Sequence, residues 1–333
     1  MENNIISETA IQPIFENEPM LQSIKKINQI KADLNQLIIG QENLIDLLIV
    51  SLVSGGNCLI EGVPGIAKTM TAKLLSISLG LNFSRIQFTP DLMPSDILGT
   101  SVFNQKNNDF EYKKGPIFSN VILIDEINRA PAKTQSALFE VMAEKQITMD
   151  GTTYKMGNPF IVFATQNPIE QEGTYRLPEA QLDRFLFNII VDYPSIESEI
   201  RIIESFNNRK NQKIEEVPIT QFSKSEIIEI QSLIHDVTIK EELIHYIAQI
   251  VTNTRVNSSL FLGASPRASL SILNASKANA ILNGRSYVIP EDIKKVAPPV
   301  LIHRIVLNPE KEMEGLTAKS VINQIIENVM IPR

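Results

Sequence analysis

Residues 62–69, with the sequence GVPGIAKT, constrain the fold of this chain more than any other segment. They follow a short apolar run at 58–61 and precede a helix-like stretch at 72–79. A strand, a glycine-containing turn and a helix in this order predict a phosphate-binding loop. In such a loop the backbone N–H groups surround the phosphates, Lys68 reaches the β- and γ-oxygens, and the Thr69 hydroxyl coordinates Mg²⁺. The alternative is a chance match within an ordinary strand–turn–helix.

One position of this loop departs from the usual pattern. Ala67 stands where a phosphate loop has its last glycine. A methyl group there is tolerable only at a negative backbone φ, because the left-handed region favours glycine. We therefore expect Ala67 to keep a negative φ.

A second segment, VILIDE at residues 121–126, supports the same chemistry. Its unbroken apolar run is typical of a strand buried on both faces of a parallel sheet. The run ends in Asp125 and Glu126, at the edge where open α/β sheets bind ligands. Asp125 is expected to hold Mg²⁺ and Glu126 to polarise an attacking water as general base. A solvated acidic turn is the alternative, and its pairing with the phosphate loop disfavours it. The chain is predicted to bind and hydrolyse a nucleoside triphosphate.

Length and composition place the chain among ordinary globular proteins. It has 333 residues, enough for two domains, of which 43% are hydrophobic and 21% charged. No apolar run approaches the roughly 18 residues of a membrane span, and the acidic, polar N-terminus does not resemble a signal peptide. We expect a cytoplasmic location. The single cysteine, Cys58, is expected to be a small buried hydrophobe. The net charge of −7, without a basic stripe, disfavours nucleic acid as a partner.

Periodicity along the chain predicts two folded parts after an N-terminal arm. Residues 1–30 are assigned to the arm, although helical spacing of leucines and isoleucines already begins near residue 21. Residues 31–194 are predicted as an α/β domain with a parallel sheet and helices on both faces. Its five strands are expected at the following positions: 58–61, 83–88, 121–124, 160–165 and 185–191. Residues 195–333 are predicted as an all-helical lid with no clear strand.

Two hairpins are predicted as insertions in the α/β domain. Residues 101–112 alternate between apolar and polar around an Asn-Asn-Asp tip, and residues 147–156 turn at Asp150-Gly151. Loops that project from a rigid scaffold often carry contacts, although such hairpins can equally be surface structure without a role.

Three further polar residues lie at positions of interest. Asn167 ends another buried strand, where its amide can contact the γ-phosphate and the attacking water. Arg184 precedes the last strand of the domain, and Arg267 lies in the first turn of a lid helix. Taken singly, the two arginines are better explained as surface residues.

The order of these features resembles the AAA+ ATPases, and whole segments closely resemble the MoxR family within them. The matching segments are GVPGIAKT, LIDEINRAPAKTQSALFEVMAEKQIT, ATQNPIEQEGTYRLPEAQLDRF and GASPRA. The resemblance covers residues 35–310, and the family's phosphate loop likewise accepts alanine before the lysine. It implies an ATPase that assembles as a homo-oligomeric ring, with a hexamer expected. It also implies a protein client that the ring remodels or matures, as well as a von Willebrand factor A-domain partner.

The same resemblance assigns roles to individual residues. Asn167 is expected as sensor 1, Arg184 as an arginine finger acting on a neighbouring subunit, and Arg267 as sensor 2 reaching the γ-phosphate of its own subunit. Gly40 and Gln41 resemble the segment beside the adenine base. The predicted ATP-binding set is Gly40, Gln41, Gly62, Val63, Pro64, Gly65, Ile66, Ala67, Lys68, Thr69 and Met70, with Thr69 and Asp125 holding Mg²⁺.

Two other functional classes share this core. A nucleic-acid motor or clamp-loader-like subunit is the main alternative, and the missing basic stripe counts against it. A nucleotide-gated scaffold with little turnover is the other, and the presence of Glu126 and Arg184 speaks against it.

Overall fold

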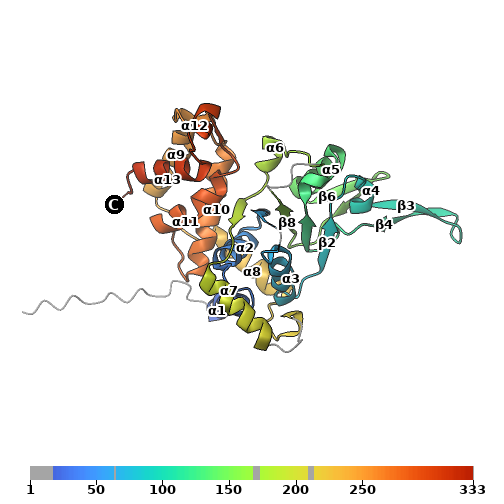
Figure 1. The fold of residues 1–333 in the computed structure, drawn as a ribbon. Helices are drawn as coiled ribbons and strands as arrows, with labels where there is room; N and C mark the ends of the chain where they lie inside the picture. The colour runs from blue at the N-terminus through green and yellow to red at the C-terminus, as the bar shows by residue number, and fades with distance from the viewer. Residues whose placement is uncertain (1–17, 64, 168–172, 209–213, 333) are drawn as a thin grey trace, which may run out of the picture.

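The computed structural model describes residues 18–63, 65–167, 173–208 and 214–332. A five-stranded parallel sheet lies at its centre (Figure 1), with the strand order β2-β5-β8-β1-β9. The strands are β1 (Cys58–Gly62), β2 (Phe83–Gln87), β5 (Val121–Asp125), β8 (Ile161–Gln166) and β9 (Phe187–Val191). The five strands predicted from the sequence are thus confirmed.

Both faces of the sheet are buried, as the apolar runs predict. Along β5, Val121 and Leu123 join one hydrophobic cluster, while Ile122 and Ile124 join a second cluster on the other face. Neighbouring strand residues point to opposite faces, so a strand buried on both sides must be apolar throughout. The helices that accompany the sheet are α1 (Glu18–Leu37), α2 (Glu42–Ser54), α3 (Lys68–Ser78), α4 (Pro94–Leu98), α5 (Ala132–Glu144), α6 (Glu179–Leu182) and the 3₁₀ helix η1 (Ile127–Arg129).

The helical pattern predicted from residue 21 is confirmed by helix α1, which lies in part within the segment assigned to the N-terminal arm. Helix α1 begins at Glu18, and Ile24, Ile27, Ile30 and Leu34 are all buried on it. Their spacing of three and four residues puts them on one face of a helix. This face packs into the core that α2 and α10 share. Residues 1–17 of the arm lie outside the described part of the chain.

Two antiparallel hairpins extend from the sheet, as predicted. The first pairs β3 (Gly99–Asn104) with β4 (Asp109–Lys114), and the second pairs β6 (Gln146–Met149) with β7 (Thr152–Lys155). The first projects far from the body of the molecule (Figure 1). Asp150 at the tip of the second hairpin accepts a hydrogen bond from the Ser101 hydroxyl of the first, so the hairpins contact each other.

The C-terminal part is helical, with one small exception. Its helices are α7 (Ile196–Asn208), α8 (Lys224–Ser232), α9 (Glu241–Val256), α10 (Pro266–Leu282), α11 (Pro290–Leu301), α12 (Pro309–Met313) and α13 (Ala318–Asn328), with short 3₁₀ turns at η2 (Ile214–Glu216) and η3 (Leu233–His235). The prediction of no strand is wrong, because β10 (Leu260–Leu262) pairs antiparallel with β11 (Val306–Leu307). Strands of two and three residues carry too little alternation for a sequence pattern to reveal them.

None of the helices in the described ranges combines the length and the apolar character that crossing a bilayer requires.

Candidate active site

The phosphate loop lies between β1 and α3, at the carboxyl edge of the sheet. Strand β1 ends at Gly62 and helix α3 begins at Lys68, so the N–H groups of the first helical turn open toward the loop. The Lys68 ammonium donates a hydrogen bond to the Gly62 carbonyl across the loop. Burial lowers the pKa of Lys68, while Asp125, Glu126 and Glu61 act in the opposite direction. Lys68 is thus a partly buried cation held over the loop.

Gly62 itself is required by a close approach of two strands. A Cβ at this position would lie 2.6 Å from the carbonyl oxygen of Val191 on β9. The side chains of Val63 and Met70 pack against the hydrophobic core, and Ile66 is buried in it. These three residues can therefore offer the phosphates only their backbone N–H groups. Pro64 lies outside the described residues.

The expected negative φ of Ala67 is wrong. Ala67 has φ 62° and ψ 16°, the left-handed conformation, and Gly65 has φ 86°. A left-handed alanine costs about 1–2 kcal/mol relative to an unstrained one. Its methyl group packs against the core cluster, which offsets part of that cost. Successive N–H groups in left-handed and right-handed conformations form a concave surface that suits an anion, so this turn favours phosphate binding.

Asp125 and Thr69 bring two oxygen donors together beside the loop. The Thr69 hydroxyl lies 3.3 Å from Asp125 Oδ1, and the Thr165 hydroxyl donates to the same oxygen at 3.2 Å. Arg85 on β2 donates from Nε to Asp125 Oδ2 at 2.5 Å. Asp125 is 5% exposed, so these partners satisfy a buried carboxylate.

This donor set fits Mg²⁺. The ion prefers oxygen ligands and is held by one or two protein groups, water and substrate phosphates rather than by a full protein cage. Thr69 and Asp125 supply a hydroxyl and a carboxylate next to the phosphate loop.

Glu126 occupies a strained position at the end of β5. Its φ of 58° and ψ of 52° are left-handed, and its backbone N–H donates to the Thr165 hydroxyl at 3.1 Å. The carboxylate contacts Gln87 Nε2 at 2.9 Å and Arg129 Nε at 3.2 Å. Strained backbone that several partners hold in place is typical of active sites. These contacts keep the Glu126 carboxylate at the mouth of the site.

Asn167, Gly40 and Gln41 lie at the same edge. Asn167 is buried directly after β8, the strand between β5 and β1. The Gln41 side chain donates to the Asp192 carbonyl at 3.4 Å, just after β9. Gly40 has φ 79° and packs against Pro194 and Ser198. The segment that follows Asn167, residues 168–172, lies outside the described residues.

Several residues that contact the site were not predicted. They are Arg85, Gln87, Arg129 and Thr165. Arg85 and Gln87 alternate with Ile86 on β2, which pairs with β5 so that Gln87 stands opposite Asp125. Polar residues at alternate positions near the end of a strand are a usable signal once the strand is known to neighbour β5.

Arg184 and Arg267 lie at the opposite edge of the sheet. Arg184 precedes β9 and donates to the Phe139 carbonyl at 2.7 Å, and Arg267 forms an ion pair with Asp183 at 3.2 Å. Strand β9 runs parallel to β1 with Phe187 opposite Cys58, so both arginines stand beside the start of β1. The phosphate loop follows its end. A five-residue strand separates the two edges by about 16 Å.

The expected reach of Arg267 to the γ-phosphate of its own subunit is therefore wrong in this structure. The direction of the parallel strands, not the length of the arginine side chain, separates Arg267 from the phosphate loop. Residues at the start of a strand and residues after its end cannot share one ligand across the sheet.

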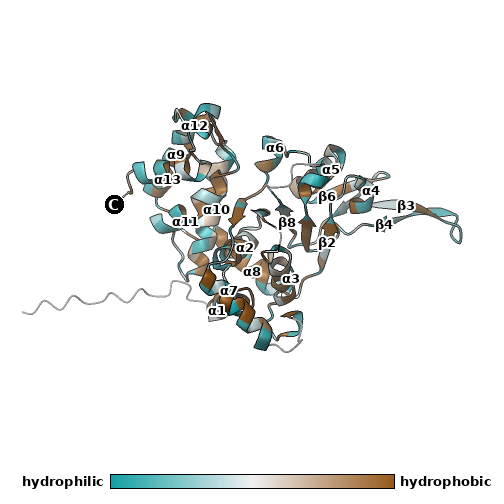
Figure 2. Ribbon diagram, in the orientation of Figure 1, coloured by the Kyte–Doolittle hydropathy of each residue, from teal (hydrophilic) through white to brown (hydrophobic). Residues whose placement is uncertain are grey.

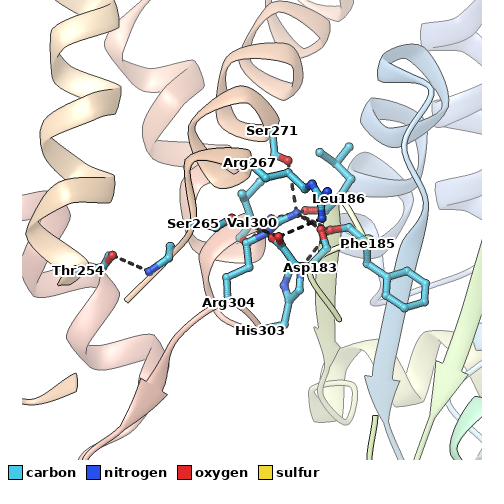
Figure 3. A network of polar contacts seen from close by, with 11 residues as sticks. Asp183, Phe185, Leu186, Thr254, Ser265, Arg267, Ser271, Val300, His303 and Arg304 are labelled. Atoms are coloured by element: carbon cyan, nitrogen blue, oxygen red, sulfur yellow. Dashed lines mark hydrogen bonds and ion pairs between the residues drawn. The ribbon is translucent and has the colours of Figure 1, made fainter. Parts of the chain in front are cut away.

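A buried ion pair fixes the arginine edge to the lid (Figure 3). Arg304 follows α11 and is almost completely buried, with 2% of its side chain exposed. It donates to Asp183 Oδ1 at 2.7 Å and to the carbonyls of Phe185 at 2.6 Å and Leu186 at 3.2 Å. The Ser265 hydroxyl and Arg267 also donate to Asp183, so one carboxylate joins α10, α11 and the start of β9.

The adjoining groove has a volume of about 530 Å³ and is lined in part by Arg184, Arg267, Leu270 and Arg304. It opens at the amino edge, away from the phosphate loop, because its other walls include Gly55 to Asn57, which precede β1.

Comparison with known proteins finds similarity over most of the chain. The chain matches the model of the ATPase family associated with various cellular activities (AAA) over residues 57–187 and that of the AAA lid domain over residues 252–325. It is 41% identical to the chaperone MoxR1 of Mycobacterium tuberculosis, over 95% of this chain and 85% of that protein. It is 44% identical to the uncharacterised protein YeaC of Bacillus subtilis, over 90% of this chain and 92% of that protein.

A solved structure also resembles the whole chain. The crystal structure of a candidate ATPase from Cytophaga hutchinsonii superimposes with a TM-score of 0.87 and 45% identity, covering 95% of this chain and 98% of that one.

We predict that glycine is tolerated better than alanine at position 67. Ala67→Gly should raise the free energy of unfolding by up to about 1 kcal/mol, since glycine adopts positive φ without steric cost. Ala67→Val should lower it, because a β-branched residue at positive φ is a strong outlier. Urea denaturation measures both. Ala137→Gly in the middle of α5 is the control and should lose about 1 kcal/mol. A loss with Ala67→Gly similar to that control would contradict the left-handed assignment.

We also predict that His303 makes the fold sensitive to acid. Burial, and secondarily the neighbouring Arg304, lowers the pKa of His303 from 6.5 to about 3. The unfolded chain therefore binds a proton that the folded chain excludes between these values. The stabilisation is complete above pH 6.5 and declines by up to about 1.4 kcal/mol per pH unit as the pH falls toward 3.

Denaturation midpoints at pH 7, 6 and 5 measure this dependence. His303→Gln should flatten the decline, since glutamine can keep the bond to the Phe185 carbonyl without titrating. His235→Gln removes an exposed histidine as the control and should leave the decline unchanged. Equal slopes for the His303 variant and the unmodified chain would rule out this source of acid sensitivity.

Proposed function

The chain belongs to the MoxR family of AAA+ ATPases, and we propose that its subunits complete one another's catalytic sites within a ring. The observation that carries this proposal is the separation of the two halves of the site. Lys68, Thr69, Asp125 and Glu126 gather at the carboxyl edge, whereas Arg184 and Arg267 lie at the amino edge. This separation supports a second copy as the source of the arginines that act on the nucleotide.

Within one subunit, the residues at the carboxyl edge bind ATP and prepare the water. The loop amides and Lys68 hold the phosphates, and Thr69 with Asp125 would hold Mg²⁺. The bound ion would neutralise charge on the β- and γ-phosphates. Glu126 accepts a proton from the attacking water as general base, and Asn167 aligns that water with the γ-phosphate. Gly40 and Gln41 border the adenine.

The neighbouring subunit then supplies positive charge to the transition state. Arg184 acts as the finger, and Arg267 acts from the same edge as a second cation in trans. Contacts between two different faces of identical subunits are heterologous, and such contacts close into rings when the rotation permits. A hexamer is the proposed closure.

Hydrolysis would be used to remodel or mature a protein client. The chaperone name of a relative at 41% identity supports this role. The Asp183 network offers a mechanical route, since Arg267 on the lid binds Asp183, the residue directly before Arg184. A change of phosphate state at the neighbouring nucleotide would then move the lid together with the start of β9. The net charge of −7 favours a protein client over nucleic acid.

We predict that Arg184→Ala abolishes ATP hydrolysis in the assembly and spares ATP binding. The loss should be on the order of 10³-fold, as for arginine fingers that act in trans. Mixing Arg184→Ala subunits with Lys68→Ala subunits should restore activity, because one lesion affects the donated arginine and the other affects the phosphate loop. Steady-state phosphate release and binding of a fluorescent ATP analogue measure the two effects.

The controls for this experiment are a surface variant and the two single variants alone. Lys224→Ala removes an exposed cation from α8 and should keep full activity. Each single variant alone should stay inactive at every protein concentration. Absence of rescue in mixtures that still assemble would show that Arg184 does not act in trans.

A second experiment tests the client. Glu126→Gln should retain ATP and turn it over slowly, because an amide cannot accept the proton of the attacking water. Affinity purification in ATP should then retain client proteins that the Lys68→Ala/Glu126→Gln double variant, which binds no ATP, does not retain. Mass spectrometry identifies them. Retention of nucleic acid in place of protein would overturn the client assignment.

A further inference from the structure

Helix α7 carries its apolar residues on the outside of the molecule. Ile196 is 71% exposed, Ile203 is 64% exposed and Phe206 is 76% exposed, and no residue of the helix is buried. Ile196, Ile200, Ile203 and Phe206 follow one another at intervals of three and four residues, so they share one face. We call these four residues the α7 stripe. Figure 2 shows brown segments along α7 on the outside of the fold.

The face of α7 that contacts the body of the protein is polar. Only Ser198 and Ser205 are partly buried among the residues of this helix, and they lie seven residues apart on the face opposite the stripe. Ser198 approaches Gly40, where an added Cβ would lie 3.0 Å from the serine Cβ. If α7 packed only against its own domain, its apolar face would be buried and its polar face exposed. The orientation therefore points to a second surface that covers the α7 stripe.

The α7 stripe borders the nucleotide half of the site. Helix α7 starts five residues after Val191, the last residue of β9, whose carbonyl approaches Gly62 of the phosphate loop. Gln41 donates to the Asp192 carbonyl in the same connection. In Figure 1, α7 lies at the bottom of the molecule with α3, while α6, which leads to Asp183 and Arg184, lies at the top. The α7 stripe thus lies on the side of the molecule that holds the phosphate loop, where the proposed function requires Arg184 and Arg267 of a neighbouring subunit.

A second set of exposed apolar residues lies on the lid, on the elements that precede and contain Arg267. Val256 is 77% exposed and Phe261 is 76% exposed, and Leu262 and Leu270 are exposed as well. These four residues, which we call the lid patch, lie on the end of α9, on β10 and on the first turns of α10. Arg255 donates to the Ala264 carbonyl at 2.8 Å and so ties the loop of the patch to α9.

The segments that carry the two surfaces have opposite formal charges, with Arg267 of the lid segment paired to Asp183. Residues 196–208 contain Glu197, Glu199 and Glu204 against Arg201 alone. Residues 254–270 contain Arg255 and Arg267 and no carboxylate. Opposite charge around two apolar surfaces favours their association over self-association of either one. It also disfavours binding of the acidic α7 to an anionic lipid surface, which amphipathic helices bind through lysine and arginine.

We propose that the α7 stripe of one subunit docks on the lid patch of the next. The inference rests on the proposed function, because it joins the edge that holds ATP to the edge that carries Arg184 and Arg267. The contact is heterologous, with a different surface on each side, and its repetition builds the ring. It gives the arginines a fixed approach to the neighbouring phosphate loop.

Cysteine cross-linking tests this contact directly. Cys58 is fully buried, and burial raises its pKa to about 12, so it stays unreactive in the folded chain. Subunits with Ile203→Cys, mixed with subunits with Leu270→Cys, should form a cross-linked pair with a short bis-maleimide in the presence of ATP. Neither variant alone should do so. A chain that carries both cysteines should give a series of cross-linked oligomers of increasing size on a denaturing gel.

The matched control replaces the lid-patch cysteine with Met330→Cys, which is at least as exposed as Leu270 but lies after α13. This variant should not cross-link to Ile203→Cys. A pair formed by Ile203→Cys alone would mean that two α7 stripes associate, and a cross-link confined within the double-cysteine chain would mean that the stripe is covered by its own subunit. Either result overturns the proposal, as does cosedimentation of the unmodified chain with anionic phospholipid vesicles through α7.

A charge variant separates this inference from the proposed function. Ile203→Glu should reduce assembly, measured by sedimentation velocity, and lower the hydrolysis rate at low protein concentration, while each chain still binds the ATP analogue. Ile244→Glu on the exposed side of α9 is the control and should assemble normally. Arg184→Ala should still cross-link between α7 and the lid patch. If mixing Arg184→Ala with Lys68→Ala subunits restores hydrolysis but the cross-link does not form, only the proposed docking surface is overturned. If the cross-link forms but mixing does not restore hydrolysis, only the proposed sharing of the catalytic site between subunits is overturned.

Discussion

The common direction of the five central strands determines where every functional group of this protein lies. Parallel strands end at one edge and start at the other, so residues that follow β1, β5 and β8 meet, and residues that precede β1 and β9 meet elsewhere. Lys68, Asp125 and Asn167 belong to the first group, and Arg184 belongs to the second. The strand length keeps the groups about 16 Å apart. No rearrangement of side chains can close that distance within one copy.

The Asp183–Arg304 pair gives the amino edge its rigidity. Removing one partner from a buried ion pair destabilises a fold by about 3–5 kcal/mol, because the remaining charge stays buried. Here the guanidinium is also satisfied by the Phe185, Leu186 and Val300 carbonyls, so its desolvation is well compensated. The lid and the start of β9 are therefore one mechanical unit at this point. Arg267 shares the carboxylate, which means that its position follows the lid.

Most of the sheet and the residues at its nucleotide edge could be predicted from the sequence, because both depend on local signals. Apolar runs reveal strands such as β5 and β8, and each run ends in the polar residue that meets the ligand edge. The left-handed φ of Ala67 was not predictable, since the compensating core contact is tertiary. Arg267 shows the same limit, because a lid arginine can face either edge until Asp183 is known to bind it. The helical spacing of Ile24, Ile27 and Ile30 made α1 visible from about residue 21, close to its observed start at Glu18.

Two independent features make the isolated subunit incomplete. The residues proposed as catalytic are divided between opposite edges of the sheet, which follows from topology, and the α7 stripe is exposed apolar surface. Exposed apolar surface of this extent favours association, and any partner that binds only the folded form also stabilises it by mass action. If one contact satisfies both needs, a subunit gains its arginines only when its helix α7 is covered. ATP hydrolysis would then be coupled to assembly by the same surface that drives assembly, so a free subunit would hold nucleotide without consuming it.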